Sequence, residues 1–296
     1  MSRIDEALMR VAKGTSPERP GGRTDAQLEQ YPKEGPSRPS ETAPASTRAR
    51  LDQSVRAGFG AGVSRIPDDP ESRAKLVTGI DAPEVFVEQY RRLAASLLEL
   101  KPADGESMSL LVTSALPREG KTLTAVNLAL TLSESYERRV LLIDADLRRP
   151  TVHEVLRTGN VVGLIDALRS QRTELPVERI SPRLSVLTAG RQQSDPMAAL
   201  TSERMKSIVE DARRTYEWVI LDAAPAAILP DAPLLSRLVA ATLLVIGAGS
   251  SPHTMVERAI AEIGRERIIG TVVNAIADHE IPATDYYGYY AAESRR

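Results

Sequence analysis

The chain has 296 residues, a formal net charge of −2 and no cysteine. This length allows one large α/β domain with a tail or a second small domain. The near-neutral charge excludes a global field that would draw the chain to nucleic acid or an anionic membrane. The absence of cysteine excludes a disulfide framework and cysteine-ligated zinc, and it fits a reducing cytoplasm.

The start of the chain and its apolar runs do not predict membrane insertion. Residues 1–10, MSRIDEALMR, lack the apolar core of a signal peptide, and the run near Leu238 to Gly249 is too short to cross a bilayer. The three histidines, His153, His253 and His279, are scattered without metal-ligand spacing. We therefore expect no direct membrane span, so any membrane role would come through a partner.

The N-terminal part of the chain divides into two segments by composition. Residues 1–14 place Ile4, Leu8 and Val11 on one face, which predicts a short amphipathic helix. Such a helix is marginal alone, so we expect it to dock on another surface or to fray. Residues 15–78 are rich in Pro, Gly, Ser, Thr, Arg and Gln, and they contain few large apolar residues. Because such a stretch buries too little surface to offset its chain entropy, it indicates a disordered linker, with a structured domain as the alternative.

Helical and strand-like segments alternate after the linker. A helix is expected from Pro83 to Leu100, where apolar residues recur at helical spacing. This alternation indicates an α/β fold with a mostly parallel central sheet and helices on both faces, whose ligands bind beyond the carboxyl ends of the strands. The expected strands are Ser109 to Ser114, Val140 to Asp144, Leu184 to Thr188, Trp218 to Asp222, Ala241 to Gly247 and Ile268 to Asn274.

A phosphate-binding loop (P-loop) is predicted between the first strand and the next helix. The first N–H groups of a helix lack internal partners and the helix dipole is positive there, so this place suits phosphate. Lys121 would neutralise the β- and γ-phosphates, and the Thr122 hydroxyl would ligate magnesium. An ordinary turn before a Lys-Thr helix start is the alternative. The segment reads Ala115, Leu116, Pro117, Arg118, Glu119, Gly120, Lys121, Thr122 and Leu123.

The P-loop departs from the general pattern at its beginning. Ala115 stands where that pattern has glycine, and Pro117 lies inside the loop. Proline removes one amide donor and stiffens the loop. We therefore expect the loop to bind phosphate with a geometry particular to its family.

Carboxylates end two further apolar strands. The segment VLLIDADLRRP places Asp144 and Asp146 after one strand, and WVILDAAP places Asp222 at the end of another. Carboxylates beside a P-loop can hold magnesium and accept a proton from an attacking hydroxyl. The alternative for Asp146 is a cap on the next turn, with Arg148 and Arg149 solvated.

These three motifs together resemble the bacterial tyrosine kinases (BY-kinases) of capsule and exopolysaccharide synthesis. Those are P-loop NTPases with deviant Walker A, Walker A′ and Walker B motifs and a fold like that of MinD and ParA. The resemblance runs from about Glu84 to the C-terminus and includes Ala189-Gly190, Asp195-Pro196, Asp231-Ala232 and Gly270-Thr-Val-Val-Asn274. It is specific at the P-loop and the Asp144–Asp146 segment and looser elsewhere.

The resemblance implies ATP and Mg²⁺ as cofactors and gives each site residue a role. Lys121 and Thr122 would bind the phosphates and magnesium, and Asp144 would be the base for the tyrosine hydroxyl. Asp146 and Asp222 would bind the magnesium ion. The position of Asn274 resembles one that contacts the adenine.

The family's substrate is a tyrosine-rich C-terminal tail, which a neighbouring subunit receives in a ring-like oligomer. Here the matching tyrosines are Tyr286, Tyr287, Tyr289 and Tyr290, in the segment DYYGYY. The expected division is a kinase domain at 79–281 and a mobile tail at 282–296, because the tyrosines follow the last strand. An aromatic tail that packs on the domain is the alternative.

The resemblance also implies partners and a location. The activator would be a separate membrane protein of the chain-length-determinant (co-polymerase) type, whose inner tail activates cytoplasmic kinases of this family. The chain would then form a homo-oligomer, bind no nucleic acid and work in the cytoplasm, recruited to the inner face of the membrane.

Two departures from the family pattern keep other functions open. Ala224 replaces the first of two usual prolines after Asp222, and Ala94 replaces the last arginine of a Glu-x-x-Arg-x-x-Arg oligomerisation motif that begins at Glu88. They motivate a nucleotide-binding scaffold without turnover. A partitioning or positioning ATPase of the ParA/MinD type shares the fold, but its P-loop has a lysine where this chain has Leu116, and it does not explain the tail tyrosines.

Overall fold

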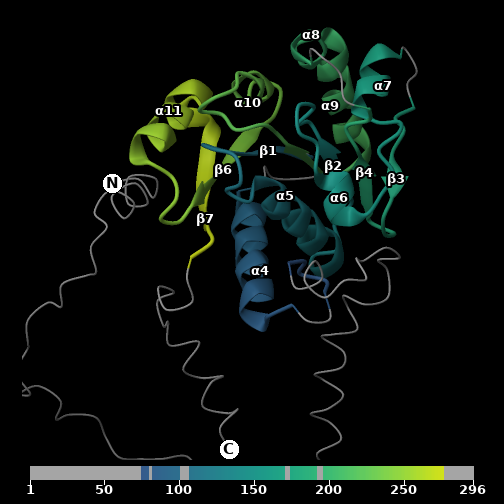
Figure 1. Cartoon of the computed structure of the whole chain (residues 1–296). Coiled ribbons are helices and arrows are strands. Elements are labelled where there is room, and N and C mark those ends of the chain that lie inside the picture. The colour runs from purple at the N-terminus through teal and green to yellow at the C-terminus, as the bar shows by residue number, and fades with distance from the viewer. Residues whose placement is uncertain (1–74, 80–81, 101–106, 171–173, 192–195, 277–296) are drawn as a thin grey trace, which may run out of the picture.

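The computed structural model describes residues 75–79, 82–100, 107–170, 174–191 and 196–276. The predicted N-terminal helix, most of the predicted linker and the tyrosine-rich tail therefore lie outside the described residues. The described part is built around one sheet with helices on its two faces (Figure 1). This arrangement confirms the α/β fold predicted from the sequence.

The strands of the sheet lie in the order β3-β4-β2-β5-β1-β6-β7. Their bounds are Met108–Ser114 (β1), Val140–Asp144 (β2), Glu178–Arg179 (β3), Leu184–Leu187 (β4), Trp218–Asp222 (β5), Ala241–Gly247 (β6) and Ile268–Asn274 (β7). All neighbouring pairs are parallel except β3 with β4. The six predicted strands are confirmed within one residue at each end, whereas β3 was not predicted, because two residues are too few to show a period.

The helices connect these strands. Their bounds are Glu84–Glu99 (α4), Lys121–Leu130 (α5), Val152–Leu156 (α6), Leu164–Arg169 (α7), Met197–Leu200 (α8), Glu203–Thr215 (α9), Asp231–Leu235 (α10) and His253–Ile263 (α11), with a π-helix at Thr131–Ser135 (η1) and a 3-10 helix at Arg265–Arg267 (η2). Helix α4 matches the helix expected from Pro83 to Leu100. In the described parts of the chain, no helix is both long and apolar enough to cross a membrane.

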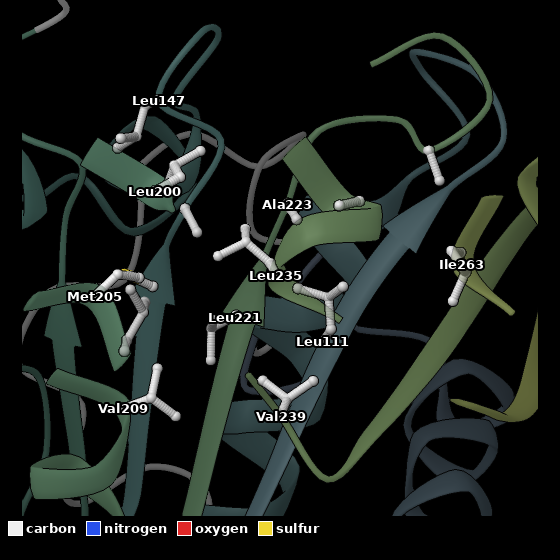
Figure 2. Packing of buried hydrophobic residues seen from close by; sticks show 14 of the residues in the cluster. Leu111, Leu147, Leu200, Met205, Val209, Leu221, Ala223, Leu235, Val239 and Ile263 are labelled. Atoms are coloured by element: carbon white, nitrogen blue, oxygen red, sulfur yellow. The ribbon is translucent and has the colours of Figure 1, made fainter. Parts of the chain in front are cut away.

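Successive strand residues face opposite sides of the sheet, and this divides the core into two clusters. Leu111 of β1 and Leu221 of β5 pack with helices α7 to α11 on one face (Figure 2). Leu110 and Ile220, their neighbours in sequence, pack with α4, α5 and α6 on the other face. Because the strands are buried on both faces, their sequences are near-continuous apolar runs.

Described residues before the predicted domain boundary at residue 79 pack with the domain. Leu76 and Val77 are each 2% exposed and belong to the cluster beneath α4 and α5. The Asn127 side chain of α5 holds this segment, because its Oδ1 accepts from the Val77 N–H at 3.0 Å and its Nδ2 donates to the Lys75 carbonyl at 2.9 Å. Residues 75–78 therefore pack with the domain and do not belong to the linker.

The parallel arrangement brings the strand ends that carry the predicted motifs to one edge of the sheet. Strand β1 lies between β5 and β6, and β5 lies between β1 and β2. In the register of β2 and β5, Asp144 is directly opposite Asp222. Because β1 also pairs with β5, the P-loop that follows Ser114 starts next to Asp222, with Asp144 one strand further along the sheet.

Candidate active site

The P-loop turns sharply between the end of β1 and the start of α5. Gly120 has φ 89°, in the left-handed region that favours glycine, and Arg118 has φ 69°. The Ser114 hydroxyl donates to the Leu116 carbonyl at 2.7 Å, which closes the first turn of the loop. Helix α5 then begins at Lys121, so the unpaired N–H groups of its first turn lie at the loop, as predicted.

The Lys121 ammonium lies among the carboxylates that the sequence predicted to meet here. Its Nζ is 2.8 Å from Asp146 Oδ2 and 3.7 Å from Asp222 Oδ1. Lys121 is 9% exposed, Asp146 is 3% exposed and Asp222 is fully buried, so these charges interact with little screening by water. In this structure the lysine is therefore held by carboxylates.

The Thr122 hydroxyl is also part of this cluster. It donates to Asp222 Oδ2 at 2.6 Å and accepts from the Thr151 hydroxyl at 3.1 Å. Thr151 was not predicted from the sequence. The only signal for it was its place directly after Pro150, which ends the segment VLLIDADLRRP.

Asp144 is fully buried and held by backbone donors. Its Oδ2 accepts from the N–H groups of Thr151 at 3.1 Å and Val152 at 3.0 Å, and its Oδ1 accepts from the Asp146 N–H at 3.3 Å. The carboxylate thus satisfies N–H groups at the start of α6. The capping role considered for Asp146 belongs in part to Asp144, although Asp146 Oδ1 also accepts from the Arg149 N–H at 3.0 Å.

Three carboxylates lie close to one ammonium group, and the pKa values of Asp222, Asp144 and Lys121 are shifted from their usual range. Burial raises the pKa of Asp222 to about 6, against the opposing effects of Lys121 and Thr122. Burial, with the nearby charge of Asp222, raises the pKa of Asp144 well above its usual range. Burial alone would lower the pKa of Lys121, but the charges of Asp222 and Asp146 raise it. The single positive charge of Lys121 is therefore too little to stabilise the ionised form of every carboxylate in the cluster.

The donor set of this cluster fits a magnesium ion that arrives with a nucleotide. Its oxygens are those of carboxylates and a hydroxyl, which are hard ligands, and the buried Asp222 Oδ1 accepts no hydrogen bond. Within the described residues, no group of three or more His, Cys, Asp and Glu side chains could hold a metal ion by itself. An ion here would therefore need further oxygens from Thr122 and from the nucleotide.

Arg148 and Asp231 form a bidentate ion pair beside the cluster. Arg148 Nε lies 2.7 Å from Asp231 Oδ2, and its second guanidinium nitrogen donates to Asp231 Oδ1 at 3.1 Å. Asp231 is fully buried at the first residue of α10. The alternative considered from the sequence left Arg148 solvated; the structure contradicts that alternative, because the pair with Asp231 fixes the loop after β2 to α10. Arg149 is exposed, as expected.

Other predicted nucleotide-binding residues are distributed along the loop and at one strand end. Ala115 is buried, Leu116 and Leu123 are partly exposed, and Pro117 is exposed. Asn274 ends β7, and its side chain donates to the Glu119 carbonyl in the P-loop. Its predicted contact with adenine stays a prediction, as do the acceptor roles of Tyr286, Tyr287, Tyr289 and Tyr290, which lie outside the described residues.

The two departures from the family pattern have local structural explanations. Ala94 is fully buried on the inner face of α4, whereas Glu88 lies 3.9 Å from Arg91 and 3.6 Å from Arg92 on the same helix. The loop that contains Ala224 is fixed to β1, because the Ala224 carbonyl accepts from the Thr113 hydroxyl at 2.7 Å and the Ala223 N–H donates to the Val112 carbonyl at 3.0 Å. Hydrogen bonds to β1 therefore hold this loop without the proline that Ala224 replaces.

The fold and this cluster together define a P-loop nucleotide-binding protein. No protein-family model matches the chain. The chain is 33% identical over 210 residues to the tyrosine-protein kinase YwqD of Bacillus subtilis, an alignment that covers 70% of this chain and 86% of that relative. The succinoglycan biosynthesis transport protein ExoP of Rhizobium meliloti is 29% identical over 212 residues, which cover 68% of this chain but 26% of ExoP.

A solved structure agrees with these relatives. The kinase domain of the Escherichia coli tyrosine kinase ETK matches with a TM-score of 0.63 and 29% identity, over 70% of this chain and 83% of that chain. The chain therefore belongs to the family of bacterial tyrosine-protein kinases, as its motifs indicated.

Proposed function

We propose that this kinase transfers the γ-phosphoryl group of ATP to the tail tyrosines of a neighbouring copy of itself. The observation that carries this proposal is the cluster of Lys121, Thr122, Asp144, Asp146 and Asp222 at one edge of the sheet. Phosphoryl transfer needs charge neutralisation and an oriented hydroxyl more than covalent chemistry from the protein. This cluster contains residues suited to each of those tasks.

The proposed roles follow from the contacts of each residue. Lys121 would exchange its ion pairs with Asp146 and Asp222 for the phosphates of the nucleotide. A magnesium ion bound with ATP would be held by Thr122, Asp146 and Asp222, and it would neutralise phosphate charge. Asp144 would take the proton of the tyrosine hydroxyl, because burial raises the pKa of its carboxyl and so strengthens it as a base. Its burial would keep water from competing for that role.

The acceptors would be Tyr286, Tyr287, Tyr289 and Tyr290, presented in trans. A tail held by a neighbouring subunit supplies its hydroxyl groups at high effective concentration. Phosphate on these tyrosines would regulate the polymerisation and export of an exopolysaccharide or capsule. The name of the relative ExoP, a succinoglycan biosynthesis transport protein, supports that process.

The activator in this proposal is a separate membrane protein of the chain-length-determinant type. It would recruit a cytoplasmic homo-oligomer of this chain to the inner face of the membrane. The N-terminal segment is the proposed contact with another component of the assembly. A deletion of residues 1–70 tests that contact without removing Leu76 and Val77, which are part of the core. Undiminished recruitment to the polysaccharide machinery after this deletion would refute it.

Autophosphorylation assays with Mg²⁺ and ATP, with and without the inner tail of the membrane partner, test the kinase proposal. We expect phosphotyrosine in the wild type and none in Lys121→Ala or in a variant with the four tail tyrosines changed to Phe. Mixing these two inactive variants tests transfer in trans. Label should then appear on the Lys121→Ala chain, which keeps its tyrosines, from the tail variant, which keeps its active site.

Other outcomes of the same assays identify the alternative functions. Magnesium-dependent ATP hydrolysis without label would favour a partitioning or positioning ATPase. Nucleotide binding with neither hydrolysis nor label, even with the activating partner present, would favour a scaffold that has lost turnover. Label on the wild type that persists in Lys121→Ala would exclude the proposed site.

A further inference from the structure

A second network holds the P-loop on the side away from the charged cluster. Its centre is the carboxylate of Glu119, which is 5% exposed. Glu119 Oε2 accepts from the Leu116 N–H at 2.7 Å, and Oε1 accepts from the Ser251 hydroxyl. Ser251 in turn accepts from the Gly247 N–H at 2.9 Å, at the end of β6. The loop is thereby fixed to the segment between β6 and α11.

The backbone of the same loop residue is held from β7. The Asn274 side chain donates from Nδ2 to the Glu119 carbonyl at 3.0 Å, and the Asn274 carbonyl accepts from the Ala248 N–H at 2.8 Å. A β-carbon on Gly120 would occupy the place of the Asn274 amide group. The close approach of Asn274 therefore depends on glycine at position 120.

The position of the Glu119 carboxylate requires a physical reason. A negative charge beside an anion-binding loop opposes the binding of phosphate, and a buried carboxylate is costly unless it is hydrogen-bonded. Here the two carboxylate oxygens have separate donors, one in the loop and one on another element. The carboxylate thus closes the loop on itself and ties it to the sheet.

We propose that Glu119 is a positioning residue that, together with Ser251, holds the P-loop in the shape that receives nucleotide phosphates. The Glu119 side chain itself contacts no phosphate in this role. The proposal rests on nucleotide binding, which is part of the proposed function, and it does not depend on the identity of the phosphate acceptor.

The test measures the affinity of the full chain for ATP and for inorganic triphosphate, which lacks the base. Ser251→Ala removes one hydrogen bond to a buried charge, and we expect about tenfold weaker binding of both ligands. Ser250→Ala is the matched control, because Ser250 is the adjacent serine and is exposed. It should bind both ligands like the wild type. A loss confined to ATP would overturn the proposal, because it would place the effect at the base.

Substitutions at Glu119 separate positioning from charge. Glu119→Gln keeps an acceptor for the Leu116 N–H and a group that can donate to Ser251, so binding should stay within about threefold of the wild type. Glu119→Ala should weaken binding at least as much as Ser251→Ala, and adding Ser251→Ala to it should cause no further loss. Tighter binding by Glu119→Ala would show that the carboxylate only repels phosphate and would overturn the proposal.

The outcomes for the two proposals differ. Wild-type protein that binds ATP without forming phosphotyrosine counts against the kinase function and leaves this test intact. Phosphotyrosine formation together with wild-type affinity in Ser251→Ala overturns the positioning role alone. Thermal melts of each variant complete the test, since a merely structural effect would lower the melting temperature while leaving both affinities unchanged well below it.

Discussion

The two sides of the P-loop are held by different kinds of interaction. On the side of β2 and β5, Lys121 lies among carboxylates that are almost fully buried. On the side of β6 and β7, Glu119, Ser251 and Asn274 form hydrogen bonds in which most donors and acceptors are already paired. One side thus holds three carboxylates around one ammonium group, and on the other side hydrogen bonds satisfy the single carboxylate of Glu119.

This difference indicates which side changes when a ligand binds. Three carboxylates with one ammonium group favour the arrival of a further cation, so the charged side should rearrange around a magnesium nucleotide. The hydrogen-bonded side gains nothing from the added charge and should keep its contacts. Substitutions on the charged side should therefore mainly change the catalytic rate and the pH dependence. Substitutions on the hydrogen-bonded side should mainly change the shape of the P-loop.

The largest expected effect is that of Lys121→Met. The variant loses the cation that neutralises phosphate, and we expect the rate of phosphotyrosine formation to fall by at least about a thousandfold. Initial rates of autophosphorylation, measured with saturating magnesium and ATP, check this. Lys206→Met on the exposed face of α9 is the control and should keep the wild-type rate. A Lys121→Met rate within tenfold of the wild type would contradict the assigned role.

The next effect is that of Asp144→Asn, which separates catalysis from folding. The amide oxygen can still accept from the N–H groups of Thr151 and Val152, whereas the proton acceptor is lost and the Asp146 N–H no longer has a carboxylate oxygen as its acceptor. We expect a rate about a hundredfold lower, with ATP affinity close to that of the wild type. The melting temperature should change little, because removal of a buried charge offsets the loss of the hydrogen bond from the Asp146 N–H at 3.3 Å. An unchanged rate would assign the proton transfer to another group.

Asp222→Asn tests the unbalanced charge through its pH dependence. The pKa of Asp222 rises from 3.8 in the unfolded chain to about 6 in the folded protein. The folded protein therefore holds this proton more tightly, and the associated stability is present below pH 4 and is lost as the pH rises through 6. Between pH 4 and pH 7 the ligand-free wild type should lose on the order of 3 kcal/mol relative to Asp222→Asn.

Urea unfolding of both proteins without nucleotide, at several pH values, measures this difference. The comparison between the two proteins cancels groups that titrate alike in both. A difference in unfolding free energy that stays constant from pH 4 to pH 7 would mean that Asp222 carries no unbalanced charge.

The sequence predicted the charged side of the site well. Asp144 and Asp222 end near-continuous apolar strands, and the parallel sheet that such strands form must bring their carboxyl ends together. The P-loop could be recognised from the sequence for a different reason: its strand, loop and helix are contiguous in the chain. The main strands, the first helix and the convergence of Lys121 with the carboxylates could therefore be derived without a structure.

The hydrogen-bonded side could not be predicted in this way. Ser251 lies 132 residues beyond Glu119, in a loop with no pattern of its own, and its contact depends on how β6 packs beside β1. The pair of Arg148 and Asp231 likewise joins two loops through the fold. Leu76 and Val77 were assigned to the linker because two apolar residues have no period. Only their packing under α4 and α5 shows that they belong to the domain.

The smallest expected effect concerns the close approach of β7 to the P-loop. Gly120→Ala places a β-carbon where the Asn274 amide lies, and it forces alanine to adopt φ 89°. Asn274→Ala removes the first conflict but not the second. The double variant should therefore be more stable, by about 1 kcal/mol, than the sum of the two single effects predicts. Urea unfolding of the three variants at one pH measures this coupling.

The sign of that coupling distinguishes two accounts of Gly120. If glycine is needed only for its backbone conformation, the two substitutions should be additive, because Asn274 does not affect the φ angle. If the loop and β7 are fitted to one another, the loss caused by Gly120→Ala should be smaller once the amide group is gone. The second result would show that the hydrogen-bonded side of the P-loop is maintained by contact, as its fixed geometry indicates.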